Sequence, residues 1–294
     1  MYGLSELKEA LSNPHLVLRE LNRAYHRRLY TRPYNTDGID IFEADWDNLI
    51  ILDACRYDTF CEVTDFEGVE SRISRGAATP EFVRGNFAGK DLHDVVYATT
   101  NSWYFRLNEE IDTEVHAALY GDQSDPPELT ETALDALDEY PNKRLLIHFI
   151  PPHHPFKGPT ADRVFPSYEE QSDALFERIQ QGELDIDDET LRQAYVENLE
   201  WVLPEVHRLL DELDGKTVVT ADHGELLGDR TAPVPIADYG HHVGLYDEHL
   251  VRVPWYESTN GTRRRIVPEP PVSDEAEVGQ EKVDQRLREL GYKV

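Results

Sequence analysis

The sequence predicts an α/β fold, with a mostly parallel sheet sandwiched by helices. Two apolar runs, 48–53 and 217–221, have the length and composition of buried strands. The first ends in Asp53, and the second is followed directly by Asp222 and His223. Helical patterns separate these runs from further strands, and such alternation is typical of parallel βαβ units. Because ligands of such sheets bind at the carboxyl ends of the strands, both runs deliver polar groups to the same edge.

The other elements follow in chain order. Residues 4–30 repeat leucines at helical spacing, with a break near Pro14, and predict a helix pair packed beside the sheet. The alternative is an arm that docks on a membrane or a partner. Further strands are expected at about 95–100, 145–150 and 251–256, and helices at about 130–139 and 188–213. The Pro-, Glu- and Gly-rich end predicts a tail. We therefore expect a helical extension over 1–40, a main α/β domain over 41–258, and a C-terminal tail over 259–294.

The charge composition excludes one class of partner. The 294 residues include 58 Asp and Glu against 29 Lys and Arg, a formal net charge of -29. Nucleic acid is not an expected partner, because its phosphates would be repelled, and the same balance of charge repels anionic membranes. The acidic residues are spread through a chain that also has apolar runs, which indicates a solvated surface adapted to high salt, where screening acts over about 3 Å at 1 M. We expect the source to be a halophilic archaeon.

Neither a disulfide scaffold nor an export signal is indicated. The cysteines are Cys55 and Cys61, too few for a thiolate-rich metal site. The first residues lack the basic and apolar regions of a signal peptide, and no apolar stretch reaches the roughly 18 residues of a membrane span. A cytoplasmic protein without a transmembrane segment is the expectation.

Several segments, in their order along the chain, resemble one known superfamily. They are the strand and loop 48–58, the histidine segment 148–156, the helix 195–213, the Asp-His segment 220–228, and the segment 240–248 with 252–254. Together they resemble the alkaline-phosphatase-like superfamily, which includes sulfatases, phosphodiesterases and phosphoglycerol transferases. The resemblance covers about residues 45–256. It implies an alkaline-phosphatase-like fold and a hydrolase or transferase of phosphate esters, with sulfate esters also open.

The resemblance also implies a divalent metal ion held by Asp53, Thr79, Asp222 and His223. Such a cation lowers the pKa of a coordinated oxygen and so activates a nucleophile. The donor set suits Mn, Zn, Mg or Ca to differing degrees, and the metal's identity stays open. The alternative is that these are polar groups at strand ends, satisfied by neighbouring loops.

Thr79 is the expected nucleophile. The superfamily takes its nucleophile from the start of the helix after the first βα unit. Thr79 before Pro80 fits such a start, with threonine at the cap and proline at the first helical position. A phosphoryl group would there meet the positive end of the helix dipole. An ordinary N-cap is the alternative role of Thr79, and Ser74 is the reserve nucleophile.

Four histidines in two loops complete the catalytic prediction. His153 and His241 are expected to grip phosphoryl oxygens or to protonate the leaving group, a task suited to a side chain that titrates near neutrality. Their neighbours His154 and His242 are adjacent candidates for binding substrate. The alternative for such histidine pairs is a solvated turn.

Three further polar residues have two open roles each. Asn101 ends a strand and can donate its amide to developing charge, but a turn-forming asparagine explains it as well. Arg56 matches an arginine of the superfamily's first loop, where it contacts substrate or ties down the loop. Glu225 either orients a metal ligand or stands at the start of a helix.

Two departures from the superfamily narrow the activity. Neither Cys55 nor Cys61 lies in the Cys-x-Pro-x-Arg segment of sulfatases, so a formylglycine sulfatase is not expected. The stretch 149–153 lacks the Asp of two-metal relatives, which favours the single-metal, Thr-dependent phosphoesterase and phosphoglycerol transferase branch. The expected substrate is a small phosphorylated or sulfated metabolite, glycan or lipid head group. The alternative function is that of an inactive relative serving as a binding or assembly subunit.

Overall fold

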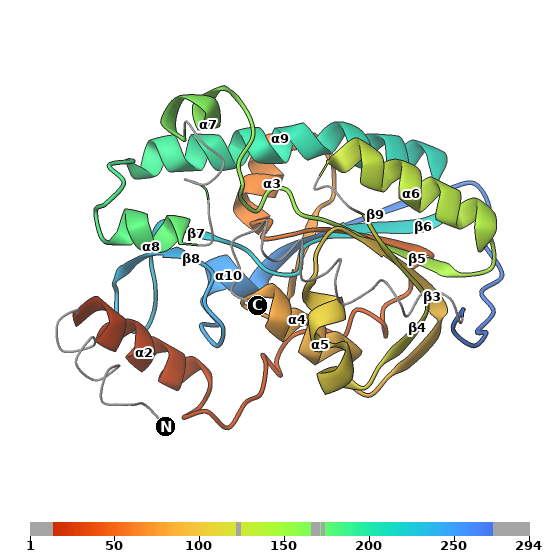
Figure 1. Cartoon of the computed structure of the whole chain (residues 1–294), viewed down its shortest axis with the longest axis horizontal. Coiled ribbons are helices and arrows are strands. Elements are labelled where there is room, and N and C mark those ends of the chain that lie inside the picture. Colours follow the sequence, from red (N-terminus) through yellow and green to blue (C-terminus); the bar gives the residue numbers. More distant parts are fainter. Residues whose placement is uncertain (1–13, 122–124, 166–170, 172–173, 273–294) are drawn as a thin grey trace.

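The computed structural model describes residues 14–121, 125–165, 171 and 174–272, and it confirms a mixed α/β fold with a mostly parallel sheet (Figure 1). The strands are β1 (Asn48–Leu52), β2 (Glu70–Ile73), β3 (Asp91–Thr99), β4 (Glu114–Tyr120), β5 (Arg144–Phe149), β6 (Gly215–Thr220), β7 (Leu226–Arg230), β8 (Ala237–Gly240) and β9 (Arg252–Asn260). The helices are α2 (Pro14–His26), α3 (Tyr57–Val63), α4 (Thr79–Phe87), α5 (Trp103–Ile111), α6 (Pro126–Glu139), α7 (Pro159–Val164), α8 (Leu175–Gln180), α9 (Asp188–Glu212) and α10 (Glu248–Val251).

One seven-stranded sheet forms the centre of the molecule, in the order β2-β9-β6-β1-β5-β3-β4. Strand β9 is antiparallel to both of its neighbours, and the other adjacent strands pair in parallel. A separate two-stranded sheet joins β7 and β8. The central position therefore belongs to β1, with β5 on one side and β6 on the other.

Helices cover both faces of this sheet, as a parallel sheet requires. Figure 1 shows α9, α6 and α3 on one face and α4 and α5 on the other. Successive β1 residues alternate between the two layers, because side chains of a strand point to opposite faces. Ile50 and Leu52 join the cluster under α9 and α6, whereas Leu49 and Ile51 join the cluster under α4 and α5. All four side chains are buried, so the strand is fixed from both sides.

The strands expected from the sequence are present as β1, β3, β5, β6 and β9, and the two expected helices are α6 and α9. Strands β2 and β4 and the hairpin of β7 and β8 were not expected from the sequence. Strands β2 and β4 are the two edges of the large sheet. Strand β2 has no buried residue, so it lacks the apolar signature of a central strand, whereas β4 does contain buried residues and was simply missed.

The described residues bear on only parts of the N-terminal and C-terminal predictions. The helical pattern before residue 14 and the tail after residue 272 lie outside the described residues. The division into three parts stays a prediction. Within residues 14–121, 125–165, 171 and 174–272, none of the helices has both the length and the apolar character needed to cross a bilayer.

Candidate active site

The candidate site lies at the carboxyl ends of the central strands. Asp53 follows β1, while Asp222 and His223 follow β6, which pairs with β1. On the other side of β1, strand β5 contributes His148 next to its carboxyl end. Helix α4 begins with Thr79. These side chains meet because parallel neighbours end at the same edge of a sheet, where open α/β folds bind their ligands.

The four residues predicted to hold a metal converge on one point. Thr79 Oγ1 lies 3.2 Å from His223 Nε2 and 3.5 Å from Asp53 Oδ2. His223 Nε2 is also 3.5 Å from Asp53 Oδ1 and 3.4 Å from Asp222 Oδ2. Each of the four residues is at most 3% exposed. A hydroxyl, an imidazole and two carboxylates therefore form one buried cluster, which we call the acidic cluster.

The spacing of the acidic cluster fits a bound cation. Four ligands placed tetrahedrally at about 2.1 Å from an ion lie about 3.4 Å from one another. Four of the distances between ligand atoms in the cluster, those that involve Thr79 or His223, are 3.2–3.5 Å. Asp53 Oδ1 and Asp222 Oδ2 are buried without a hydrogen-bond partner among the described residues. Because buried carboxylate oxygens are normally paired, a divalent cation would satisfy both at once.

Backbone contacts aim the ligand atoms inward. The Nδ1 atom of His223 is 2.8 Å from the carbonyl oxygen of Gly224, which accepts its proton and leaves the lone pair of Nε2 facing the cluster. Asp222 Oδ1 accepts hydrogen bonds from the amides of Ala54 at 3.1 Å and His223 at 2.9 Å. This contact turns Oδ2 toward the cluster.

Burial controls the protonation of the acidic cluster. Burial and the nearby charge of Asp222 raise the pKa of Asp53 well above its ordinary value, outweighing hydrogen bonds from Asn101 and Thr79. Burial, together with His241, lowers the pKa of His223 well below its usual range, so that this imidazole stays neutral. A neutral imidazole is the form that binds metal, and a cation would favour the ionised form of Asp53.

His148 is a member of the site that the sequence analysis did not select. Its Nε2 lies 3.8 Å from both Asp53 Oδ2 and Asp222 Oδ2, and it has no hydrogen-bond partner within the described parts of the chain. Its Nδ1 is 2.9 Å from the hydroxyl of Tyr97. Burial lowers the pKa of His148 to about 4. The signal in the sequence was a single imidazole near the carboxyl end of the otherwise apolar β5.

Thr79 is the first residue of α4, and Ala78 takes the cap position. The expectation that Thr79 itself caps the helix was therefore wrong by one residue, although its hydroxyl still lies at the helix start. The loop before the helix turns tightly. A Cβ atom at Gly76 would lie 2.4 Å from the backbone nitrogen of Phe82, so only glycine fits there.

Asn101 and Ser74 contact the two aspartates of the acidic cluster. Asn101 Nδ2 donates a hydrogen bond to Asp53 Oδ2 at 2.6 Å. Its amide therefore lies at the site, where it orients this carboxylate. Ser74 donates its hydroxyl proton to the backbone carbonyl of Asp222 and accepts from the amide of Gly76. These contacts use the Ser74 hydroxyl to join the α4 loop to β6.

Arg56 anchors the loop after β1. The residue is 2% exposed, and its guanidinium forms ion pairs with Asp58 and Asp229. Helix α9 holds the same loop through the hydroxyl of Tyr195, which accepts from the Arg56 amide at 2.9 Å and donates to the Ala54 carbonyl at 2.7 Å. Of the two roles left open for Arg56, these contacts match that of tying down the loop.

The predicted histidine loops lie beside the acidic cluster. The ring centroid of His241 is 4.5 Å from that of His223 and 5.0 Å from that of His153. Ligand atoms of His153, His154 and Glu225 all lie within 4.8 Å of one another. Glu225 Oε1 is 3.0 Å from His241 Nδ1. Glu225 is followed by β7, so it does not begin a helix, and its place next to the histidines is that of an orienting group.

The same burial shifts the titration of these loops. Burial lowers the pKa of His153 and of His241 to about 4. Burial raises the pKa of Glu225 to about 8. Near neutral pH the proton at this end of the site is therefore held by Glu225. His242 points elsewhere, with its Nε2 atom 3.3 Å from Asp238 Oδ1.

Comparison with known proteins finds similarity among solved structures alone. No protein-family model matches the chain, and no curated protein is similar to it. The C-terminal periplasmic domain of EcEptC from Escherichia coli, in complex with Zn, is 14% identical over 72% of each chain, with a TM-score of 0.47. EptA from Neisseria meningitidis, an integral membrane lipooligosaccharide phosphoethanolamine transferase, is 16% identical over 72% of this chain and 47% of that chain, with a TM-score of 0.46. A phosphonate monoester hydrolase from Silicibacter pomeroyi is 21% identical over 58% of this chain and 42% of that one, with a TM-score of 0.30.

The comparisons contradict the expected cytoplasmic location. Several of the similar structures are periplasmic domains. The expectation rested on the lack of an export signal and a membrane span, and such an absence is no evidence of where a protein works. At these low identities and TM-scores, the similarity concerns the arrangement of the fold and assigns no activity to this chain.

Proposed function

We propose that this protein is a metal-dependent enzyme that transfers or hydrolyses phosphate esters with Thr79 as the nucleophile. One observation carries the proposal. The Thr79 hydroxyl lies at the start of α4, within 3.5 Å of Asp53 and His223. Two carboxylate oxygens of this cluster have no hydrogen-bond partner among the residues that the structure describes. An ordinary polar cluster at strand ends would satisfy its own oxygens, whereas this one leaves them directed at a shared point.

The residues of the chain suit an in-line attack on phosphorus. When bound, a divalent cation would supply charge neutralisation for the hydroxyl and the phosphoryl oxygens, and Asp53, Thr79, Asp222 and His223 would hold it. Thr79 Oγ1 gives up its proton to water and attacks phosphorus. The bond between phosphorus and the leaving oxygen breaks, this oxygen takes up a proton as the alcohol departs, and a phosphothreonine remains. Water or an acceptor alcohol then attacks the same phosphorus, the bond from phosphorus to Thr79 Oγ1 breaks, and the proton that the attacking group loses is balanced by the one that Thr79 regains.

The neighbouring loops provide groups for substrate and leaving group. His153 and His241 lie next to the acidic cluster, with Glu225 beside His241. Neutral imidazoles can donate an N–H to nonbridging oxygens, and the protonated Glu225 can return a proton through His241 to the leaving oxygen. The preferred substrate remains a small phosphorylated metabolite, glycan or lipid head group, with a sulfated one as the variant.

Activity and covalent labelling test this proposal. The full chain is assayed in molar salt with p-nitrophenyl phosphate, bis-p-nitrophenyl phosphate and p-nitrophenyl sulfate, with Mn, Zn, Mg or Ca. We expect metal-dependent turnover of a phosphate ester, a loss of about 1000-fold in Thr79→Ala, and partial activity in Thr79→Ser. Thr132→Ala, at a half-buried threonine of α6 whose hydroxyl bonds to the Glu128 carbonyl of the same helix, is the matched control.

Peptide mass spectrometry after a rapid acid quench provides an independent readout, because a trapped intermediate places a phosphoryl group on Thr79. Undiminished activity in Thr79→Ala would overturn the nucleophile. If the metal-bound protein binds phosphate esters but neither turns them over nor becomes labelled, the alternative role as an inactive binding subunit is the better one.

A further inference from the structure

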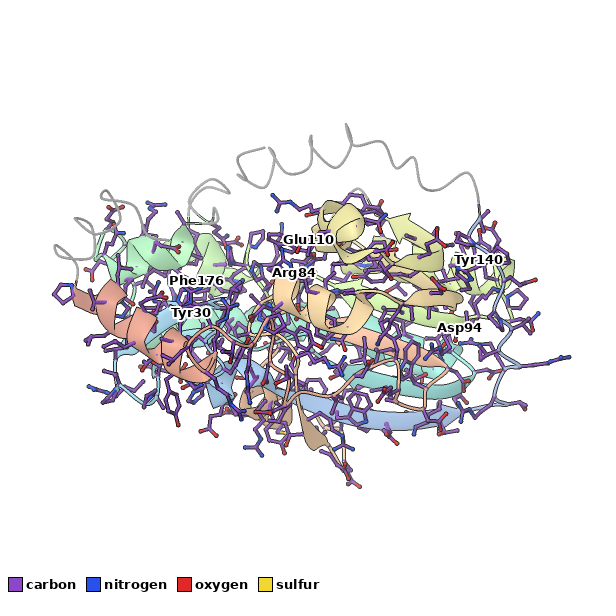
Figure 2. All side chains as sticks on the ribbon, turned by 90° about the horizontal axis from the view of Figure 1, so that it is seen from below. Tyr30, Arg84, Asp94, Glu110, Tyr140 and Phe176 are labelled. Atoms are coloured by element: carbon purple, nitrogen blue, oxygen red, sulfur yellow. The ribbon has the colours of Figure 1, made fainter. Side chains whose placement is uncertain are left out.

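Helix α2 carries its polar side toward the protein and its apolar side away from it. His15 and His26 contact the backbone carbonyls of Ala237 and Ala232, each at 2.8 Å. Arg19 donates two hydrogen bonds to Asp238, at 2.8 and 2.7 Å. These contacts, with those of the fully buried Asn22 to the loop before β8, hold the helix beside the hairpin of β7 and β8. Figure 1 and Figure 2 show α2, and Tyr30 just after it, at one end of the molecule, away from the large sheet.

The opposite side of α2 and the turn after it form an apolar strip, defined as Val17, Leu21, Tyr25, Leu29 and Tyr30. The exposed fractions are 41%, 54%, 65%, 79% and 44% in that order. Val17, Leu21 and Tyr25 are spaced four residues apart, so they share one face of the helix. Of the seven large hydrophobic residues that are exposed in the described chain, five belong to this strip. A helix face of this kind is normally covered by another apolar surface.

The surroundings of the apolar strip are basic, although the chain is acidic. Residues 14–34 contain five arginines and one glutamate, whereas the whole chain has a net charge of -29. Salt bridges take up Arg19, Arg23 and Arg32. Arg28 is exposed and forms no salt bridge with a described residue. The apolar strip is therefore flanked by positive charge that is free to meet an anionic partner.

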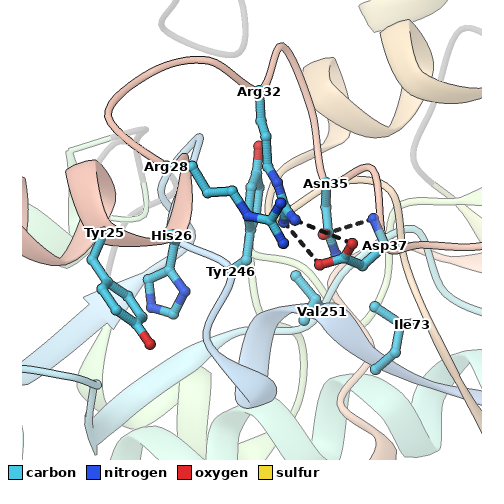
Figure 3. Close-up of a pocket in the computed structure, with 9 residues that line it drawn as sticks. All are labelled: Tyr25, His26, Arg28, Arg32, Asn35, Asp37, Ile73, Tyr246 and Val251. Carbon is cyan, nitrogen blue, oxygen red and sulfur yellow. Dashed lines mark hydrogen bonds and ion pairs between the residues drawn. The ribbon is translucent and has the colours of Figure 1, made fainter.

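A cavity of about 430 Å³ adjoins the end of the apolar strip. Figure 3 shows the guanidinium groups of Arg28 and Arg32 close together at the centre, with Tyr25 and His26 on one side and Asp37 on the other. Asp37 binds Arg32 through both carboxylate oxygens, at 2.8 and 3.1 Å. Arg28 consequently remains as the cationic group that can face a ligand in the cavity.

We propose that α2 and the turn after it form a docking surface for an anionic phospholipid bilayer. The apolar strip enters the boundary between head groups and acyl chains, α2 lies in the plane of the membrane, and Arg28 meets phosphate groups at the mouth of the cavity. A bilayer offers both hydrocarbon and negative charge over an extended flat area. The five arginines and one glutamate of residues 14–34 complement such a surface locally, although the chain as a whole is acidic. A second copy of the chain fits less well, because a symmetric contact would bring the basic residues around the two strips against each other.

Vesicle flotation of the full chain tests this surface. Vesicles of phosphatidylcholine with about 30% phosphatidylglycerol are compared with vesicles of phosphatidylcholine alone. We expect the wild type to float with the anionic vesicles and to prefer them less as salt is added. Arg28→Glu should reduce the bound fraction at least about fivefold, because one basic residue near an anionic surface changes partitioning by about that factor. Leu21→Glu should also reduce it, because it places a negative charge on the apolar face that enters the membrane boundary.

Matched controls lie away from α2. Val272→Glu places the same charge on an exposed apolar side chain elsewhere, and Arg265→Glu reverses an exposed arginine beyond β9, near the opposite end of the sheet. Both should float like the wild type. If Leu21→Glu lowers the melting temperature, Leu29→Glu replaces it, because Leu29 is 79% exposed.

Three results would overturn the proposal. They are a wild type that stays with the soluble fraction, variants that float as well as the wild type, or a dimer in sedimentation that Leu21→Glu dissociates while vesicles remain unbound. The last result would assign the strip to contact between copies. Because flotation does not depend on turnover, the proposed enzymatic function can fail while this one stands.

Discussion

Replacing Asp222 by asparagine separates the two roles of the acidic cluster, as a fold element and as a cation site. Asp222 Oδ1 accepts two backbone hydrogen bonds, whereas Oδ2 is unpartnered and lies 3.4 Å from His223 Nε2. In Asp222→Asn the amide oxygen can keep the backbone contacts, and the amide nitrogen can donate to the lone pair of His223. The variant also removes the charge of Asp222, which together with burial raises the pKa of Asp53. We therefore expect the metal-free variant to be at least as stable as the metal-free wild type.

The cation makes the opposite contribution. A metal ion present at about 100 times its dissociation constant stabilises the folded state by about 2.7 kcal/mol. For a chain of this size that corresponds to a rise of roughly 5 °C in melting temperature. An amide nitrogen cannot replace a carboxylate ligand, so Asp222→Asn should lose nearly all of this rise. The assay is thermal unfolding followed by circular dichroism, with and without Zn, Mn, Mg or Ca.

Asp91→Asn is the matched control, because Asp91 belongs to an exposed group with His93 and Glu114 whose ligand atoms also lie within 4.8 Å of one another. This variant should keep the full metal-induced rise. Asp222 would not be a ligand of the cation if the melting temperature of Asp222→Asn rose with metal as that of the wild type does, or if Asp91→Asn abolished the rise. A metal-free Asp222→Asn protein that melts several degrees below the metal-free wild type would contradict the account of the unpartnered oxygen.

Two further predictions concern single side chains. His148→Gln should weaken metal binding, measured by calorimetry, at least about tenfold if Nε2 of His148 faces the cation, and unchanged affinity would remove His148 from the site. Although burial raises the pKa of Asp238, contacts with His242 and Arg19 outweigh it and lower the pKa from 3.8 to about 2, which corresponds to about 2 kcal/mol of stability. This contribution is present above about pH 4 and is lost as the pH falls toward 2. The difference in free energy of unfolding between wild type and Asp238→Asn, measured with urea, should therefore disappear over that range. A difference that does not depend on pH would contradict this prediction.

The central strands could be predicted from the sequence because they are buried on both faces. In β1 every residue is buried, which gives an uninterrupted apolar run and a clear end at Asp53. The edge strand β2 has the sequence Glu70 to Ile73 and no buried residue, so local composition carries no such signal. What makes it a strand is its pairing with β9, almost two hundred residues later in the chain. Pairing at that distance cannot be inferred from local periodicity.

The same distinction explains which site residues could be predicted. Asp53, Asp222 and His223 stand at strand ends, where the fold class itself indicates a site. His148 lies within a strand, one position before its last residue, and its direction depends on the pleat of β5 and on contact with Tyr97. The burial that shifts the pKa of the histidine loops likewise comes from packing between distant segments, and a sequence pattern does not contain it.

The structure also explains why the site can stand ready before a cation arrives. Three buried atoms, Asp53 Oδ1, Asp222 Oδ2 and His148 Nε2, have no partner in the described chain, at a cost of about 1–3 kcal/mol each. The four apolar residues of β1 are fully buried and contribute about 2 kcal/mol each. The cost of the three unpartnered atoms and the stabilisation from the four buried residues are of the same size. Helices on both faces of the sheet hold β1 in place, and β1 positions Asp53. A cation would therefore bind to a formed site, unlike the metal in small domains that fold only around it. The melting temperatures with and without metal can therefore be compared directly, because the chain is folded in both states.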